Sequence, residues 1–338
     1  MIATPLFRHL FPALLAVLLC VAPVAAQQPT AVNPTASSVT EKQLLDALKP
    51  NSTDTVAGRV SIPDVRAGNL IQPTGVEFRA YQTTTIFQVG AIAIPGMLAL
   101  LALFYLIRGR IRIQGGPSAQ TIVRFAWFSR FVHWMTATSF IALGLSGLNL
   151  VFGKTLLLPV IGASAFSAMS QLGKFVHDYV SFAFALGIFL MFVMWVKDNL
   201  PALRDIRWIV QFGGMLGFGH PPADRFNAGQ KLMFWATILG GGTLAVSGYI
   251  MMFRPVSFAI SAMQLATVVH GLTGVVLVAI IFAHIYIGTV GMEGAFRAMG
   301  RGTVDLNWAK EHHSVWVEKV ARKRPKDISG GPAPAPAE

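Results

Sequence analysis

Cysteine is nearly absent from this chain, because Cys20 is the only one among its 338 residues. No Cys-x-x-Cys-His sequence occurs, which excludes covalent attachment of a c-type haem. A single thiol also excludes an iron–sulfur cluster held by this chain's cysteines. Any redox cofactor that the chain binds must therefore be held non-covalently by other side chains.

Charged residues are scarce as well. Only 12% of the residues are charged and 54% are hydrophobic, and the mean hydropathy is +0.57. These values lie outside the range of ordinary soluble domains. The chain also lacks the long alternation of apolar and polar residues that a membrane barrel needs. Because backbone groups in lipid must be bonded internally, we predict an all-α fold, a polytopic transmembrane helical bundle.

Acidic residues are the scarcer of the two charge types, with 15 Asp and Glu against 27 Lys and Arg, a net charge of +12. Such a balance could indicate a nucleic-acid partner. The basic residues lie beside apolar spans, however, as the positive-inside rule describes. We therefore expect a lipid bilayer as a partner, and no nucleic acid.

The two ends of the chain differ in composition from its middle. Residues 1–26 combine Arg8 with an apolar run and the small-residue end Val24-Ala25-Ala26, which predicts a signal peptide, with an uncleaved anchor as the alternative. Residues 27–84 are rich in Gln, Pro, Thr, Ser and Asn and are expected to form a periplasmic extension. Residues 327–338 consist largely of Gly, Pro and Ala, which predicts a disordered tail.

Five apolar spans long enough to cross a membrane lie between these ends. They cover about residues 85–107, 133–152, 175–196, 232–253 and 265–291. We interpret 85–107 as an extra transmembrane helix and 108–129 as a cytoplasmic linker. Residues 130–326 are then a four-helix bundle with a cytoplasmic tail.

Lys and Arg in the connections set the orientation. Segments 108–130 and 197–231 and the tail after the last span are rich in both, whereas the opposite connections hold only Lys154, Lys174 and Arg254. The basic segments are therefore placed in the cytoplasm. This gives a multi-pass protein of the bacterial inner membrane with a periplasmic mature N-terminus and a cytoplasmic C-terminus.

Histidines within the spans form the main functional signal. His270 and His284 share the last span, fourteen residues apart, which on a helix separates them by roughly 21 Å and leaves them within about 40° of one face. By depth His177 matches His270 near the periplasm, and His133 matches His284 near the cytoplasm. Two such pairs predict the axial ligands of the iron in two non-covalent b haems. A hydrogen-bonded core imidazole or a proton relay is the alternative for any single one.

Glycines near these histidines could leave room for a flat macrocycle, although close helix packing also favours glycine. This group comprises Gly144, Gly147, Gly187, Gly271 and Gly274. Gly240, Gly241, Gly242 and Gly248 lie in a span without a ligand, and we assign them to packing alone. For His220, His312 and His313, outside the spans, we expect a surface or partner contact.

At these residues the chain resembles the cytochrome b (gamma) subunits of membrane-bound formate dehydrogenases, over about residues 123–322. The landmarks are Arg130-Phe-Val-His133-Trp134, Gly173-Lys-Phe-Val-His177, Asn227-Ala-Gly-Gln-Lys231, Arg254-Pro255, Val269-His270-Gly271, Ala283-His284-Ile-Tyr286 and Trp308-Ala-Lys-Glu-His312-His313. The compact family form has four helices, so the resemblance implies a di-haem four-helix core plus one extra N-terminal span.

The resemblance implies a subunit of a quinone-reducing formate dehydrogenase complex. It would pass electrons from a periplasmic iron–sulfur subunit, fed by a molybdenum or tungsten catalytic subunit, through two b haems to membrane quinone. The chain itself carries no formate-oxidising site and no catalytic residue. The family's quinone pocket corresponds to Asn227, Gly229 and Gln230. A polar helix start with Asn227 as its cap explains these residues equally well.

Three other functions compete with this interpretation. The two-haem histidine pattern is shared with cytochrome b subunits of hydrogenases and related oxidoreductases. A proton-coupled transporter would also place histidines in the membrane, but the chain shows no inverted repeat and its histidines avoid the centre of the spans. A structural membrane anchor would not need four intramembrane imidazoles.

Overall fold

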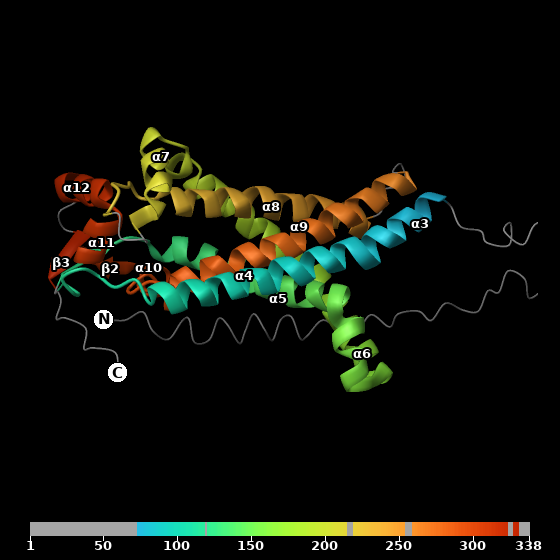
Figure 1. Ribbon diagram of the computed structural model, residues 1–338. Coiled ribbons are helices and arrows are strands. Elements are labelled where there is room, and N and C mark those ends of the chain that lie inside the picture. Colours follow the sequence, from blue (N-terminus) through green and yellow to red (C-terminus); the bar gives the residue numbers. More distant parts are fainter. Residues whose placement is uncertain (1–72, 119, 215–218, 254–258, 324–326, 331–338) are drawn as a thin grey trace, which may run out of the picture. The chain divides into compact units, whose positions relative to one another are not determined.

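The computed structural model describes residues 73–118, 120–214, 219–253, 259–323 and 327–330 (Figure 1). The chain divides into two units, Met1–Leu70 and Ile71–Glu338, and every described residue belongs to the second. The predicted signal peptide, most of the predicted extension and residues 331–338 lie outside the described residues.

Five helices of the described residues are long and apolar enough to cross a membrane, as the sequence predicts. The first begins with α3 (Pro73–Ala80) and the π-helix η1 (Tyr81–Thr85) and continues as α4 (Ile86–Arg108). The next three are α5 (Trp127–Leu156), α6 (Leu158–Trp195) and α8 (Ala228–Phe253). The last is α9 (Ile260–Tyr286), extended by the π-helix η4 (Ile287–Gly291).

The four helices α5, α6, α8 and α9 form a bundle. Helix α5 packs along α6, α6 against α8, α8 along α9, and α9 against α5. Helix α4 lies along the outer side of α9 (Figure 1). One close approach is at Gly187 of α6, where an added Cβ would lie 2.2 Å from Thr136 Oγ1 of α5. The predicted arrangement, a four-helix core with one additional span, is therefore the observed one.

Helix α6 differs most from its predicted span. The sequence places its start near Phe175, but the helix begins at Leu158 and covers 38 residues. Its backbone is non-helical at Gly162, with φ 78° and ψ 167°, so the first turn points in a different direction from the rest. The residues between Gly162 and Phe175 are mostly small or polar. A search for apolar spans therefore misses them, although such residues can form a helix.

A three-stranded antiparallel sheet closes one end of the bundle, which we call the sheet end. Its order is β2–β1–β3, with β1 at Gln120–Val123, β2 at Thr303–Asp305 and β3 at Ile328–Gly330. Ile122 of β1 is opposite Val304 on one side and Ile328 on the other. Two predictions are thus wrong in part: segment 108–129 is more than a linker, and residues 328–330 of the predicted disordered tail form a strand.

Short helices surround the sheet. They are α7 (Leu203–Val210) with the 3-10 turns η2 (Lys197–Asn199) and η3 (Phe212–Gly214), then α10 (Arg297–Gly300), α11 (Leu306–His312) and α12 (Ser314–Lys323). Asp305 ends β2 and caps α11, since its carboxylate accepts hydrogen bonds from the backbone N–H groups of Asn307 and Trp308. A carboxylate at this position satisfies donors that a helix start leaves free.

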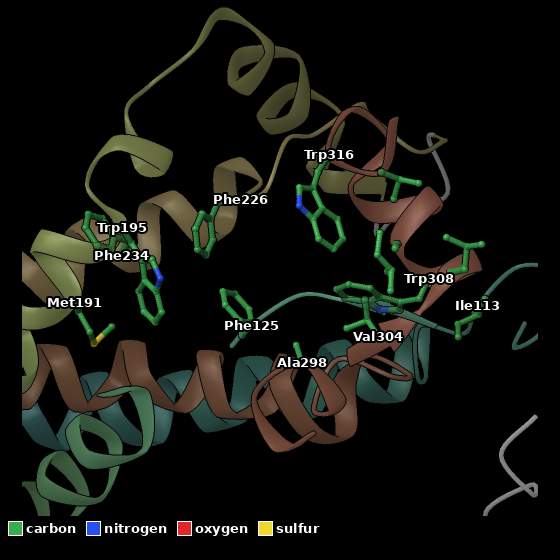
Figure 2. Packing of buried hydrophobic residues seen from close by; sticks show 14 of the residues in the cluster. Ile113, Phe125, Met191, Trp195, Phe226, Phe234, Ala298, Val304, Trp308 and Trp316 are labelled. Carbon is green, nitrogen blue, oxygen red and sulfur yellow. The ribbon is translucent and has the colours of Figure 1, made fainter. Parts of the chain in front are cut away.

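The main apolar core joins the sheet end to the bundle (Figure 2). Trp195 and Met191 from α6 lie near Phe125, which follows β1, while Trp308 and Trp316 come from the C-terminal helices. The remaining members of this core are Ile113, Ile122, Val132, Phe226, Phe234, Ala298, Val304, Leu306, Ala309 and Val317. The C-terminal segment is therefore packed onto the ends of α5, α6 and α8.

The contact at Gly187 generates a stability prediction. Replacing Gly187 with Ala should lower the stability of the purified protein by about 1–3 kcal/mol, because the methyl group overlaps Thr136 and separates α5 from α6. Helicity followed during denaturation in mild detergent measures the effect. Gly242→Ala on α8 is the matched control, since an added Cβ there meets nothing within 4 Å. Equal stability of both variants would contradict the close approach.

Candidate functional site

His177 and His270 face each other at the end of the bundle remote from the sheet, which we call the far end. His177 lies on α6 and His270 on α9, and their ring centroids are 6.0 Å apart. Each imidazole has a serine partner: Ser146 Oγ of α5 is 2.9 Å from His177 Nδ1, and Ser247 Oγ of α8 is 3.0 Å from His270 Nδ1. All four helices of the bundle thus contribute to this pair.

The serine contacts fix the tautomer of both imidazoles. Ser146 can donate its hydroxyl proton to the Ala142 carbonyl at 2.8 Å, and Ser247 to the Thr243 carbonyl at 2.6 Å. The hydroxyl oxygens then accept from Nδ1–H of the histidines. Each Nε2 keeps its lone pair, which is the form of imidazole that binds a metal ion.

His133 and His284 form the second pair, at the sheet end. His133 is on α5 and His284 on α9, with ring centroids 6.1 Å apart. Trp134 stands edge-on to His133 at 5.4 Å and donates its indole N–H to the Met299 carbonyl. His133 Nδ1 is buried without a hydrogen-bond partner in the described residues. The two pairs therefore differ, because the far-end imidazoles have hydroxyl partners and His133 does not.

The spacing within each pair suits one metal ion between two imidazoles. A ligating nitrogen lies about 2 Å from its metal and about 1 Å from its own ring centre, so two opposed ligands have centroids about 6 Å apart. Both observed pairs meet this distance. Because each pair spans two helices and supplies only nitrogen donors, the residues fit a haem held by two histidines.

Glycines separate into two groups by what they touch. An added Cβ at Gly147 would lie 3.6 Å from His177 Cε1, and one at Gly248 would lie 3.2 Å from His270 Cε1. These two leave space beside the imidazoles. Gly271 instead receives Ile86 of α4, and Gly187 receives Thr136. The assignment of Gly248 to packing alone was wrong, whereas Gly240 and Gly241 do pack against neighbouring helices, at Leu277 and Ile188.

Asn227 and Gln230 form a reciprocal cap at the start of α8. Asn227 Oδ1 accepts from the Gln230 backbone N–H at 2.9 Å, and Gln230 Oε1 accepts from the Asn227 backbone N–H at 3.1 Å. This is the pattern of a capping box. The cap uses both side-chain amide oxygens, and the two side-chain NH2 groups remain as hydrogen-bond donors for another group. Sequence reasoning anticipated the cap at Asn227, but not the return bond from Gln230.

The neighbours of this cap are already engaged with α7. Trp208 of α7 covers Gly229, where an added Cβ would lie 2.7 Å from the indole ring. Lys231 is buried, and its ammonium donates to Asp205 at 2.8 Å and to the Leu200 carbonyl at 2.9 Å. The Asn227–Gln230 amides are thus the polar groups of this helix start that remain suited to a ligand.

His313 is completely buried, so the predicted surface contact is wrong for this residue. Its Nε2 lies 3.0 Å from Arg124 Nη2 and its Nδ1 lies 2.7 Å from the Asp224 carbonyl oxygen. Since a guanidinium can only donate, Nε2 must accept and Nδ1 must carry the proton. The neutral imidazole therefore joins the C-terminal segment to the segments before α5 and α8. His220, in contrast, is exposed, with its ring 6.0 Å from that of His312.

Electrostatics around His313 oppose a second positive charge. Burial, and then the Arg124 guanidinium, hold the pKa of His313 well below its usual value. Burial, and then His220 and Arg124, lower the pKa of His312 to about 4. Arg124 is itself 4% exposed, and its own pKa is lowered to about 9 by burial and then by Arg225. At neutral pH Arg124 is therefore positively charged, whereas His312 and His313 are neutral.

The sequence of this part of the chain matches a known protein family. The sequence model of the prokaryotic cytochrome b561 family matches residues 124–302, slightly more than half of the chain. That stretch contains both histidine pairs and all four helices of the bundle, whereas α4 lies before it.

Curated relatives match a stretch of similar length. The cytochrome b556(fdo) subunit of formate dehydrogenase from Escherichia coli K12 is 32% identical over 212 residues, which are 61% of this chain and 96% of the relative. The cytochrome b556(Fdn) subunit of the nitrate-inducible formate dehydrogenase of the same strain is 29% identical over 217 residues, 62% and 97% of the two chains. The formate dehydrogenase cytochrome b556 subunit of Haemophilus influenzae is 28% identical over 214 residues, 61% and 87%.

The buried histidine cluster predicts acid sensitivity of the C-terminal segment. An unfolded histidine takes up a proton near pH 6.5, whereas folded His313 and His312 resist protonation, so stability falls as pH drops below about 6.5. The slope is about 1.4 kcal/mol per pH unit for each histidine until its folded pKa is reached. Hydrogen exchange of residues 303–323 at pH 7 and pH 5 should show this loss. His313→Gln should flatten the pH dependence and His220→Gln should not; equal slopes would contradict the assignment.

Proposed function

The chain belongs to the prokaryotic cytochrome b561 family, and we propose that it is the membrane cytochrome b subunit of a formate dehydrogenase complex, carrying electrons through two b haems to quinone. The observation that carries the proposal is a pair of facing imidazoles at each of two levels along α9, with ring centroids 6.0 Å and 6.1 Å apart. Four histidines arranged as two opposed pairs are the ligand set of two haems in a helical bundle.

His177 and His270 would hold one haem, and His133 and His284 the other. Haem supplies reversible one-electron chemistry, and the protein sets how readily each iron accepts the electron. Ser146 and Ser247 orient the far-end imidazoles and increase their basicity by accepting from Nδ1–H. Gly147 and Gly248 leave space beside these rings. Because His133 Nδ1 has no such partner among the described residues, this sheet-end ligand would donate less electron density, which favours electron movement from the far end to the sheet end.

This direction agrees with the topology that we propose. The Lys- and Arg-rich segments meet at the sheet end, which we place in the cytoplasm of a bacterial inner membrane with the C-terminus. The far end then faces the periplasm, as does the mature N-terminus. An iron–sulfur subunit, fed by the molybdenum or tungsten subunit that oxidises formate, would deliver electrons there. The relatives' names, which describe subunits of formate dehydrogenases, support this choice of complex.

We place quinone at the start of α8, where Asn227 and Gln230 lie at the sheet end. Their amide oxygens are used in the cap, so the amide N–H groups are the donors available to a quinone carbonyl. Gly229 contributes through its contact with Trp208, which forms one wall of this region. Arg124 Nη2 lies 3.5 Å from Gln230 Oε1 and helps to fix the orientation of that amide.

A cytochrome b subunit of a hydrogenase or a related oxidoreductase is the second candidate, since the histidine pairs serve any electron donor equally well. Purifying the intact complex and identifying its other subunits separates the two. A molybdenum or tungsten subunit with formate activity supports the proposal, and a nickel–iron subunit overturns it. A proton-coupled transporter or a structural anchor would be colourless when purified.

Removal of one ligand at each end tests the haem assignment. His270→Ala and His284→Ala should each reduce the haem bound per chain from two towards one, because each removes one of the two protein ligands proposed for one iron. Pyridine haemochrome quantitation of the purified complex measures this loss, with His220→Ala as an exposed-histidine control. Retention of the full absorption after replacement of both His270 and His284 would refute the assignment.

The serine contacts predict a shift in reduction potential. Ser247→Ala removes the acceptor for His270 Nδ1–H, which lowers the basicity of the ligand and favours ferrous iron. A net hydrogen bond of about 0.5–1.5 kcal/mol corresponds to a rise of roughly 20–60 mV for one electron. Spectroelectrochemical titration should detect this rise for one haem only. Thr138→Ala, which removes a hydroxyl bonded only to its own helix backbone, should leave both potentials unchanged.

A cap-preserving substitution separates the two roles of Asn227. Asn227→Ser keeps a side-chain oxygen that can cap α8 but removes the amide donor. Stability and haem content should stay normal while the KM for a soluble quinone rises about two- to tenfold, the cost of one hydrogen bond. Asn227→Ala should in addition lower stability by about 1 kcal/mol. Quinone kinetics identical to the wild type in Asn227→Ser would leave Asn227 as a cap alone.

A further inference from the structure

Helix α7 is strongly two-sided, and its apolar side is not covered by the described protein. Leu203, Ile206, Ile209 and Val210 are between 61% and 87% exposed. At about 100° per residue these four side chains fall within an arc of about 120°. We call them the α7 stripe. Exposed apolar side chains gathered on one face indicate a contact surface rather than scattered surface residues.

The opposite side of α7 is held to the bundle by specific contacts. Asp205 accepts from Lys231 of α8 at 2.8 Å and from the Ala202 backbone N–H at 2.7 Å, and the first of these is a largely buried ion pair. Trp208 packs onto Gly229 at the start of α8. These contacts fix the rotation of α7 about its own axis. The α7 stripe therefore points away from the bundle because these contacts hold the opposite side of α7 against α8.

The depth of α7 follows from the helices on either side of it. The connection starts where α6 ends, at Trp195, and finishes where α8 begins, at Ala228, and both helices cross the membrane. Helix α7 contacts the first turn of α8 and stands at the side of the bundle there (Figure 1). It is consequently level with the end of the hydrocarbon region, where Trp195 and Trp235 also lie.

Phe212 continues the same surface just beyond α7. Its φ of 48° places a bulky residue in the left-handed region, which costs about 1–2 kcal/mol relative to the usual conformation. Its side chain is nevertheless 57% exposed. A strained backbone that presents an aromatic ring outward needs a compensating contact. Lipid at the headgroup boundary provides such a contact for an aromatic side chain.

We propose that α7 is an interfacial helix that lies in the membrane surface at the sheet end, with the α7 stripe and Phe212 among the lipid acyl chains. Arg207, exposed at the edge of the stripe, then reaches the phosphate groups of the lipids. The occupant of the surface is the bilayer itself. The proposal requires only that α6 and α8 span the membrane, so it stands or falls independently of haem, quinone and formate.

Spin labelling of the intact complex in lipid nanodiscs of phosphatidylethanolamine and phosphatidylglycerol tests this placement. Cys20→Ser provides the background for single labels at Ile206→Cys and Val210→Cys. Leu239→Cys, exposed on the spanning helix α8, is the lipid control, and Lys310→Cys on α11 is the aqueous control. Collision with oxygen reports lipid, and collision with a water-soluble nickel chelate reports solvent.

Both α7 labels should show an oxygen-to-nickel ratio well above that of Lys310→Cys and below that of Leu239→Cys, which lies deeper, near the middle of α8. A ratio equal to that of Lys310→Cys would overturn the proposal by placing the stripe in water. Protection from both reagents would overturn it by assigning the stripe to a partner subunit. With the label at Val210, Arg207→Glu should increase its accessibility to the nickel chelate, whereas Lys323→Glu on α12 should not. Equal accessibility in the two variants would contradict the proposed contact between Arg207 and lipid phosphate.

Discussion

The cost of placing an imidazole inside an apolar bundle governs this structure. A polar ring in hydrocarbon is costly unless its nitrogens have partners, and four such rings lie on three helices here. At the far end the protein supplies those partners itself, because Ser146 and Ser247 satisfy the Nδ1 atoms and leave each Nε2 directed elsewhere. At the sheet end His133 Nδ1 has no hydrogen-bond partner within the described part of the chain. Small residues beside the rings and the serine hydroxyls on neighbouring helices both follow from this requirement.

A second constraint operates outside the membrane, where Arg124 joins three distant parts of the chain. Its guanidinium bonds to His313 near the C-terminus and to the Arg225 carbonyl before α8, and it stacks near Trp308 and Trp316. The positive charge is sustained by aromatic faces and carbonyl oxygens instead of a carboxylate. This arrangement explains why a histidine in this cluster must remain neutral, and why α11 and α12 are held against the segments that precede α5 and α8.

The sequence predicts the spans and both histidine pairs because these depend on local periodicity and on depth along a helix. The fourteen-residue spacing of His270 and His284 is enough to place the two rings roughly 21 Å apart along one side of α9. Local periodicity does not reveal the sheet, because β1 and β2 are only three or four residues long. The two strands are also separated in the sequence by all four helices of the bundle. The serines, Gly248 and Trp208 were missed for a similar reason. Their roles are set by side chains on other helices, and nothing in their immediate sequence distinguishes them from packing residues.

The pairing of β1 with β2 has a consequence for electron transfer. Strand β1 precedes α5, which carries His133, and β2 follows α9, which carries His284, after η4 and α10. The ladder between Ile122 and Val304 thus joins the chain segments next to the two helix ends that carry His133 and His284. A link of this kind restricts how far the two imidazoles can separate. For the haem that we propose between them, such stiffness would keep the reorganisation energy low, although none of the side chains of the sheet would take part in the redox step.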